Sequence, residues 1–166
     1  MKKNILWISL VVFLVPGLVS AQGDTYFGVK AGSMSVDVDG ISDVINAGVL
    51  VGYNVNKNLA IEGEFTTSLS DGDATISGSQ GKWNIDTIAV YAVHRSAGDT
   101  YFKGKVGFLN EDISITIPGY VPFSGSDSGL SFGVGVGFEV GKSSRIEFEY
   151  TLIEADVNML SATYLF

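Results

Sequence analysis

The stretch that most constrains this fold is Leu130–Val140, where large apolar residues alternate with small or acidic ones. Every even-numbered residue in it is Leu, Phe or Val, and every odd-numbered residue is Ser, Gly or Glu. A period of two indicates a β-strand with two different faces, not a helix. A glycine-rich face is a poor water-exposed surface, because glycine weakens a strand and shields nothing. The wall of a narrow membrane barrel explains both faces, since its inside is crowded and its outside meets lipid.

The N-terminal segment has the order of a secretory signal peptide. Two lysines precede the apolar run 5–15, and Val19-Ser20-Ala21 supplies a small-residue cleavage site. A retained membrane anchor is the alternative, but the apolar run is shorter than the ~20 residues that a spanning helix needs. We therefore expect residues 1–21 to be a cleaved signal peptide and residues 22–166 to form one exported domain.

The composition excludes some partners and some modes of stabilisation. The chain has a net charge of −8, and cleavage after Ala21 would remove Lys2 and Lys3 and make it more negative. Nucleic-acid binding needs a basic patch, so we expect no nucleic-acid partner. The chain has no cysteine and therefore no disulfide. No apolar run after residue 21 is as long as a transmembrane helix, so a membrane location would require a closed barrel.

Eight segments have strand periodicity, and together they predict the fold class. They are residues 25–36, 45–55, 59–69, 82–95, 100–110, 130–140, 145–153 and 157–166. Tight turns at 56–58, 96–99 and 141–144 alternate with longer connections, of which 70–81 and 111–128 are the longest. This rhythm is typical of transmembrane barrels. The pattern predicts an all-β fold, an eight-stranded antiparallel up-and-down transmembrane β-barrel.

The segment 82–95 is the most ambiguous, because both of its faces are partly apolar. The outward face is assigned to Trp83, Ile85, Thr87, Ala89, Tyr91 and Val93. The inward face is then Asn84, Asp86, Ile88, Val90, Ala92 and His94.

Charged side chains fall on the inward faces and are predicted to form a structural network in the lumen. The candidates are Lys30, Glu62, Glu64, Asp86, His94, Lys103, Lys105, Glu139, Glu147 and Glu149. An eight-stranded lumen is only wide enough for side chains to fill, and isolated buried charges are costly, so these groups should pair. A gate or an ion path is the alternative. Acids outnumber bases in this set, which leaves trapped water or altered carboxylate ionisation as explanations.

The C-terminal strand carries the sharpest motif. Leu160, Ala162, Tyr164 and Phe166 share one face, and this ending resembles the C-terminal assembly signal of bacterial outer-membrane barrels. Gly28-Val-Lys-Ala-Gly32 and Tyr101-Phe-Lys-Gly-Lys-Val-Gly107 are similar to the first and fifth strands of small OmpA/OmpX-type barrels. The resemblance implies a monomeric barrel in the outer membrane of a Gram-negative bacterium. It also implies contact with outer-membrane lipid and lipopolysaccharide, and insertion by the barrel-assembly machinery.

Three other motifs are candidates for sites. His94-Arg95-Ser96 has the His-x-Ser spacing of an outer-membrane lipid A deacylase, but it lies against a tight turn, and we predict no catalysis and no cofactor. The acidic segment Asp37–Asp43 lacks the spacing of a calcium loop, so no metal site is predicted. Tyr120, Val121 and Phe123 form either a contact patch for a host or neighbouring-cell surface, or the tip of a protruding hairpin.

These observations favour a structural or surface-interaction protein with an adhesin-like role, a plugged lumen and no catalysis. Two alternatives stay open. One is a narrow ion or solute channel. The other is a soluble, lipocalin-like periplasmic binder, in which the apolar faces would point inward.

Overall fold

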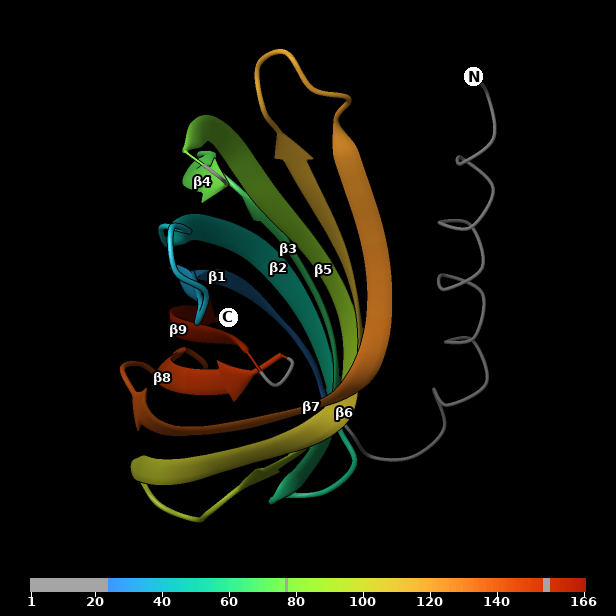
Figure 1. Cartoon of the computed structure of the whole chain (residues 1–166). Coiled ribbons are helices and arrows are strands. Elements are labelled where there is room, and N and C mark those ends of the chain that lie inside the picture. The colour runs from blue at the N-terminus through green and yellow to red at the C-terminus, as the bar shows by residue number, and fades with distance from the viewer. Residues whose placement is uncertain (1–23, 77, 154–155) are drawn as a thin grey trace.

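The computed structural model describes residues 24–76, 78–153 and 156–166, and it is a closed antiparallel barrel (Figure 1). The strands are β1 (Thr25–Val36), β2 (Val44–Asn54), β3 (Leu59–Ser68), β4 (Gly72–Ile76), β5 (Ser79–Arg95), β6 (Thr100–Thr116), β7 (Phe123–Glu139), β8 (Arg145–Leu152) and β9 (Val157–Leu165). The signal peptide predicted for residues 1–21 lies outside the described residues. Within the described part of the chain, no helix is long and apolar enough to cross a membrane.

Eight of the nine strands form the closed ring, and the short strand β4 is not part of it. Consecutive strands pair around the barrel, β3 pairs with β5, and β1 pairs with β9 to close it. The short strand β4 pairs with β5 outside this ring, from Gly72 opposite Trp83 to Ile76 opposite Ser79. The predicted eight-stranded antiparallel barrel is therefore confirmed.

The outer wall is apolar, as the alternation in Leu130–Val140 predicts. Leu130 and Val134 are exposed on this wall, whereas Ser131 is buried inside. The soluble lipocalin-like alternative required the reverse and is wrong. The inward glycines have a steric reason, because a Cβ on Gly137 would overlap the ring of Tyr101. Large side chains from β6 thus lie over the glycines of β7 and fill the lumen.

The two ends of the barrel differ. One end, the tight-turn end, has the short connections after β2, β5 and β7. At the other, the long-loop end, the strands are longer than predicted. The segment 70–81 contains β4, and the segment 111–128 is mostly strand, because β6 runs to Thr116 and β7 begins at Phe123. The β6–β7 pair is the protruding hairpin that the sequence allowed, and it extends beyond the other strands at the top of Figure 1.

The parity predicted for 82–95 is wrong. Trp83, Ile85, Tyr91 and Val93 are buried inside the barrel, whereas Asp86 and His94 are exposed on the outer wall. At Trp83 and Ile85 the cause is the apolar long-loop end of the lumen, whereas Tyr91 and Val93 face the other half, where Tyr91 packs against Lys105.

An apolar core fills that end of the lumen. Met34, Val44, Trp83 and Ile85 are at most 2% exposed, and the Trp83 indole N–H donates to the carbonyl of Ser42 at 2.8 Å. Apolar side chains on β5 therefore point inward there. The rule that polar residues face the lumen describes most positions of the other half, where Val93 and Leu165 are apolar exceptions.

Candidate functional site

Charged side chains from five strands converge in the half of the lumen nearest the tight turns. We define the luminal network as Lys30, Glu62, Glu64, Arg95, Lys103, Lys105, Glu147 and Glu149. Each is at most 7% exposed. The network holds four cations and four carboxylates, so its formal charge is balanced. Burial of so many charges is tolerable because each one contacts groups of opposite sign.

The layer nearest the tight turns is centred on Arg95. Its Nε lies 2.7 Å from Oε1 of Glu147, and its Nη2 lies 2.5 Å from Oε1 of Glu62. Nζ of Lys103 is 2.8 Å from Glu147 and 3.2 Å from Glu62. The Tyr26 hydroxyl donates to Oε1 of Glu62 at 2.7 Å and accepts from Nη1 of Arg95 at 2.9 Å. A single guanidinium thus joins β1, β3, β5 and β8.

The next layer is a closed ring of alternating charges. Nζ of Lys30 lies 2.7 Å from Glu64 and 3.0 Å from Glu149. Nζ of Lys105 lies 2.9 Å from Glu64 and 2.7 Å from Glu149, which completes the ring. Lys103, 2.8 Å from Glu149, connects the two layers. The four ring members come from β1, β3, β6 and β8, which are alternate strands of the barrel.

Three of the predicted network residues lie elsewhere. Asp86 is exposed on the outer wall and accepts a hydrogen bond from the Thr67 hydroxyl at 2.6 Å. His94 is also exposed on that wall, and Glu139 is exposed at the tight-turn rim. The prediction fails for both β5 residues because it inverts the parity of that strand, and Glu139 lies beyond the enclosed part of the lumen.

Arg95 is the member that sequence reasoning missed. Its position follows from the corrected parity of β5, which turns its odd-numbered residues inward. The imbalance in the predicted set was the available signal. Removing Asp86, His94 and Glu139 and adding Arg95 yields the balanced network that the structure contains.

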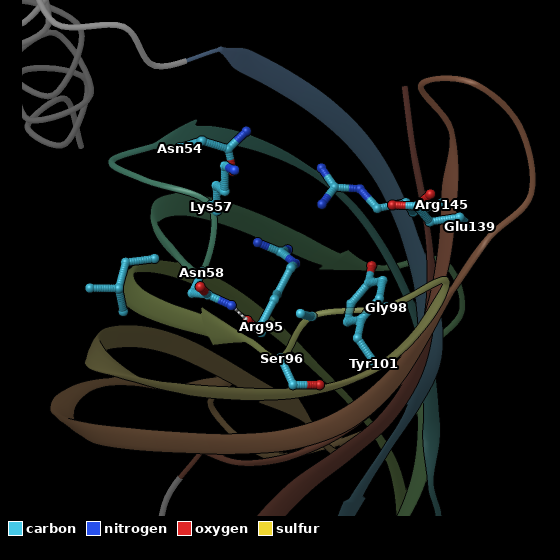
Figure 2. Close-up of a pocket in the computed structure, with 11 residues that line it drawn as sticks. Asn54, Lys57, Asn58, Arg95, Ser96, Gly98, Tyr101, Glu139 and Arg145 are labelled. Atoms are coloured by element: carbon cyan, nitrogen blue, oxygen red, sulfur yellow. Dashed lines mark hydrogen bonds between the residues drawn. The ribbon is translucent and has the colours of Figure 1, made fainter.

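The tight-turn mouth is a small polar cavity of about 130 Å³ whose lining includes Arg95 of the luminal network (Figure 2). Figure 2 shows Arg95 and Tyr101 pointing into it, with Lys57 and Arg145 at its edge. The Asn58 amide donates to the carbonyl of Arg95 at 2.7 Å, which fixes the end of β5 over the mouth. The cavity wall is therefore continuous with the luminal network.

His94 and Ser96 of the His-x-Ser motif lie at the tight-turn end of the barrel. His94 faces outward, while the Ser96 hydroxyl accepts a hydrogen bond from the Phe102 N–H at 2.9 Å. Among residues 24–76, 78–153 and 156–166, no three His, Asp or Glu side chains gather so as to hold a metal ion.

The residues of the predicted assembly signal lie on the outer face at the barrel seam. Leu160, Tyr164 and Phe166 are exposed there, and Ala162 shares their face of β9. Phe166 exchanges backbone hydrogen bonds with Phe27 at 2.9 and 3.1 Å. Recognition of these residues during insertion stays a prediction.

The long-loop end presents an exposed hairpin with an open edge. β7 pairs with β6 along Phe123–Phe138, but it pairs with β8 only from Phe132 to Glu139. In the described part of the chain, the segment Phe123–Ser131 has no strand on its second side. At the tip, Tyr120 is 67% exposed and Val121 91% exposed.

The exposed surface at this end is acidic. Its exposed carboxylates include Asp37, Asp39, Asp43, Asp71, Asp73, Asp86, Asp112 and Asp127. Lys82 is the one exposed lysine or arginine at this end among the described residues, and its Nζ lies 2.5 Å from Asp73. The outer surface is thus strongly negative, although the luminal network is neutral.

Comparisons with known proteins agree with this architecture. The sequence matches the family described as "Outer membrane protein beta-barrel domain" over residues 7–163. A comparison with curated protein sequences finds no significant match.

Solved structures show the same fold. Neisserial surface protein A is similar with a TM-score of 0.66 and 14% identity, over 87% of this chain and 98% of that one. Ail, the attachment invasion locus protein of Yersinia pestis, crystallised with the heparin analogue sucrose octasulfate, is similar with a TM-score of 0.55 and 18% identity, over 87% and 97% of the two chains. OprG of Pseudomonas aeruginosa is similar with a TM-score of 0.61 and 10% identity, over 85% and 95%.

Proposed function

Because the chain belongs to the outer-membrane β-barrel domain family and is therefore a protein of the bacterial outer membrane, we propose that it is a surface-interaction protein. The barrel is its membrane anchor, and the β6–β7 hairpin contacts the partner. Tight turns face the periplasm in such barrels and longer loops face outward. The observation that carries the proposal is the open edge of β7 at the outer end.

The open edge offers backbone hydrogen bonds to an extended partner segment. Phe123–Ser131 would be about 30 Å long at about 3.4 Å per residue. Strand addition at such an edge uses main-chain bonds for affinity and side-chain contacts for selectivity. The apolar tip at Tyr120 and Val121 adds a second contact beside it. Exposed apolar groups of this kind mark interaction sites.

The surface charge favours a basic or neutral partner. Ail was crystallised with a sulfated sugar, but a polyanion would be repelled by the acidic outer end of this chain. Lys82, the exposed cation there among described residues, is already paired with Asp73. A polypeptide segment with Lys or Arg residues matches both the open edge and the charge.

The lumen supports an anchor and not a channel. The luminal network occupies one half of the interior, and the apolar core that includes Trp83 and Met34 fills the other. An eight-stranded barrel leaves little further space. The plugged lumen therefore forms part of the proposal.

Adhesion of whole bacteria tests the proposed role. One variant replaces Tyr120, Val121 and Phe123 with Ser, and a second is Ser128→Pro. The Ser128 N–H donates to Oδ1 of Asp127 at 2.7 Å, so proline there obstructs the edge without removing a bond to β6. Both variants should lower adhesion to host or neighbouring cells.

Val38→Ser is the matched control, because Val38 is an exposed apolar residue of a different outer loop. It should adhere like the wild type. Unchanged adhesion in both hairpin variants, at equal surface abundance, would show that the hairpin does not contact a partner.

A further inference from the structure

The outer wall of the barrel contains an apolar groove of about 730 Å³ that the anchor and hairpin roles do not explain. Two neighbouring cross-strand rows form it. One row runs through Phe27, Val51, Gly63, Val90 and Phe108. The other runs through Val49, Phe65, Ile88, Asn110 and Ser128. Apart from Gly63, which has no side chain, these residues point outward from the barrel wall.

Gly63 forms the floor of this groove, and the protein itself does not require a glycine there. A Cβ at Gly63 would meet only Cγ1 of Val51, at 3.7 Å, which is an ordinary contact. The luminal Gly137 is different, because Tyr101 occupies the space beside it. The missing side chain at Gly63 leaves a hollow between the exposed rings of Phe27, Phe65 and Phe108.

The groove rises obliquely from the periplasmic side toward the outer surface. Phe27 lies near the start of β1 at the tight-turn end, whereas Ser128 belongs to the part of β7 beyond the end of β8. Five strand-to-strand steps of about 4.8 Å make the groove about 24 Å long. One leaflet is about half of the ~30 Å hydrocarbon core, so a tilted acyl chain fits within this length.

The outward-facing polar side chains of the groove lie at its upper end. Asn110 and Ser128 line it there, and the Asn110 amide donates to the carbonyl of Asp127 at 2.9 Å. The wall above is polar, with Asp112 and Ser126 as the next outward pair. The polar end of the groove therefore lies at the outer boundary of the apolar band.

We propose that this groove binds one acyl chain of a lipopolysaccharide molecule from the outer leaflet. The medium against this wall is hydrocarbon, so its occupant is a lipid chain. The chain descends from the outer side, because the groups that can bond an ester, an amide or a hydroxyl, Asn110 and Ser128, lie at that end. Close packing against Gly63 supplies the affinity, since dispersion contacts and not water exclusion select partners inside a membrane.

Photo-crosslinking in intact cells tests the proposal. A benzophenone amino acid is placed at Phe108 in the groove, or at Leu152, which is exposed on the outer wall of β8 outside it. Position 108 should yield at least about fivefold more lipopolysaccharide adduct than position 152, a ratio that corresponds to ~1 kcal/mol. Equal yields at the two positions would reduce the groove to general bilayer contact. Phospholipid adducts in place of lipopolysaccharide would refute the assigned lipid.

A second test of the proposal fills the groove with a larger side chain. Gly63→Leu should lower the adduct at position 108, whereas Gly104→Leu should not. Gly104 is also an outward glycine, its Cβ would have no neighbouring atom within 4 Å, and it lies outside the groove. Heat-modifiable mobility in SDS reports whether each variant folds. If Gly63→Leu does not fold, the comparison of positions 108 and 152 in the unsubstituted groove still decides the question.

Discussion

Replacement of Arg95 by Met gives the sharpest test of the luminal network. The guanidinium contacts Glu62 and Glu147 at 2.5 and 2.7 Å and donates to the Tyr26 hydroxyl at 2.9 Å. Met retains most of the apolar stem but leaves the carboxylates with one cation fewer. Breaking a buried ion pair by removing one partner costs about 3–5 kcal/mol. We expect a loss of that size in the free energy of unfolding.

The assay is urea unfolding of the barrel refolded in lipid vesicles, followed by tryptophan fluorescence. His94→Ala is the matched control, because this neighbouring side chain faces the outer wall and its removal should change stability by less than about 0.5 kcal/mol. A loss below about 1 kcal/mol for Arg95→Met, or an equal loss for His94→Ala, would refute the network.

A double-mutant cycle isolates the charge from the packing. Glu147→Gln removes the carboxylate that Arg95 contacts and should also destabilise the barrel when made alone. Combined with Arg95→Met it restores the charge balance. The double variant should therefore lose less than the sum of the two single losses, with a coupling of about 0.5–3 kcal/mol. Strict additivity would mean that the two residues do not interact.

Three further outcomes follow from the interior. Gly137→Val should prevent folding or cost about 3 kcal/mol, because its side chain would overlap Tyr101, while Gly104→Val should fold normally; SDS mobility before and after boiling distinguishes them. Trp83→Ala should cost about 3–5 kcal/mol by opening the apolar core, measured by urea unfolding followed by circular dichroism because Trp83 is the one tryptophan in residues 22–166, and retained stability would show that this half of the lumen is loosely packed. The wild-type barrel should produce no conductance steps in planar bilayers, and steady single-channel currents would contradict the plugged lumen.

The strand pattern was readable from the sequence wherever one face met lipid and the other met the charged half of the lumen. Leu130–Val140 and the strand with Lys103 and Lys105 meet that condition. β5 does not, because its inner face passes from Arg95 into the apolar core at Trp83. Assigning one face to lipid and the other to charged side chains fails for β5, because its inner face meets both the luminal network and the apolar core.

The long-loop end was harder to predict for a related reason. Residues 111–128 are rich in Ser, Gly and Asp, which is typical of loops. Ile113 and Ile115 on β6 pack against the apolar core, but residues 123–128 of β7 are mostly exposed and need no apolar alternation. Pairing with β5 and with each other holds the two strands extended. The polar composition of this segment reflects its exposure to water and does not reveal that its backbone pairs in β-strands.

The ring formed by Lys30, Glu64, Lys105 and Glu149 also constrains how the barrel assembles. Lys30 and Glu149 are 119 positions apart in the chain and meet only when the first and last strands have joined. The pairs Lys30–Glu64, Glu64–Lys105 and Lys105–Glu149 each span one intervening strand and can form in an open sheet, whereas the Lys30–Glu149 pair forms only on closure. An incomplete barrel therefore lacks the ion pair that closes the ring. Insertion should therefore be a single cooperative event. It should be slow, as for other folds dominated by distant contacts. A strand paired in a shifted register would leave charges of the ring unpaired and would be unstable.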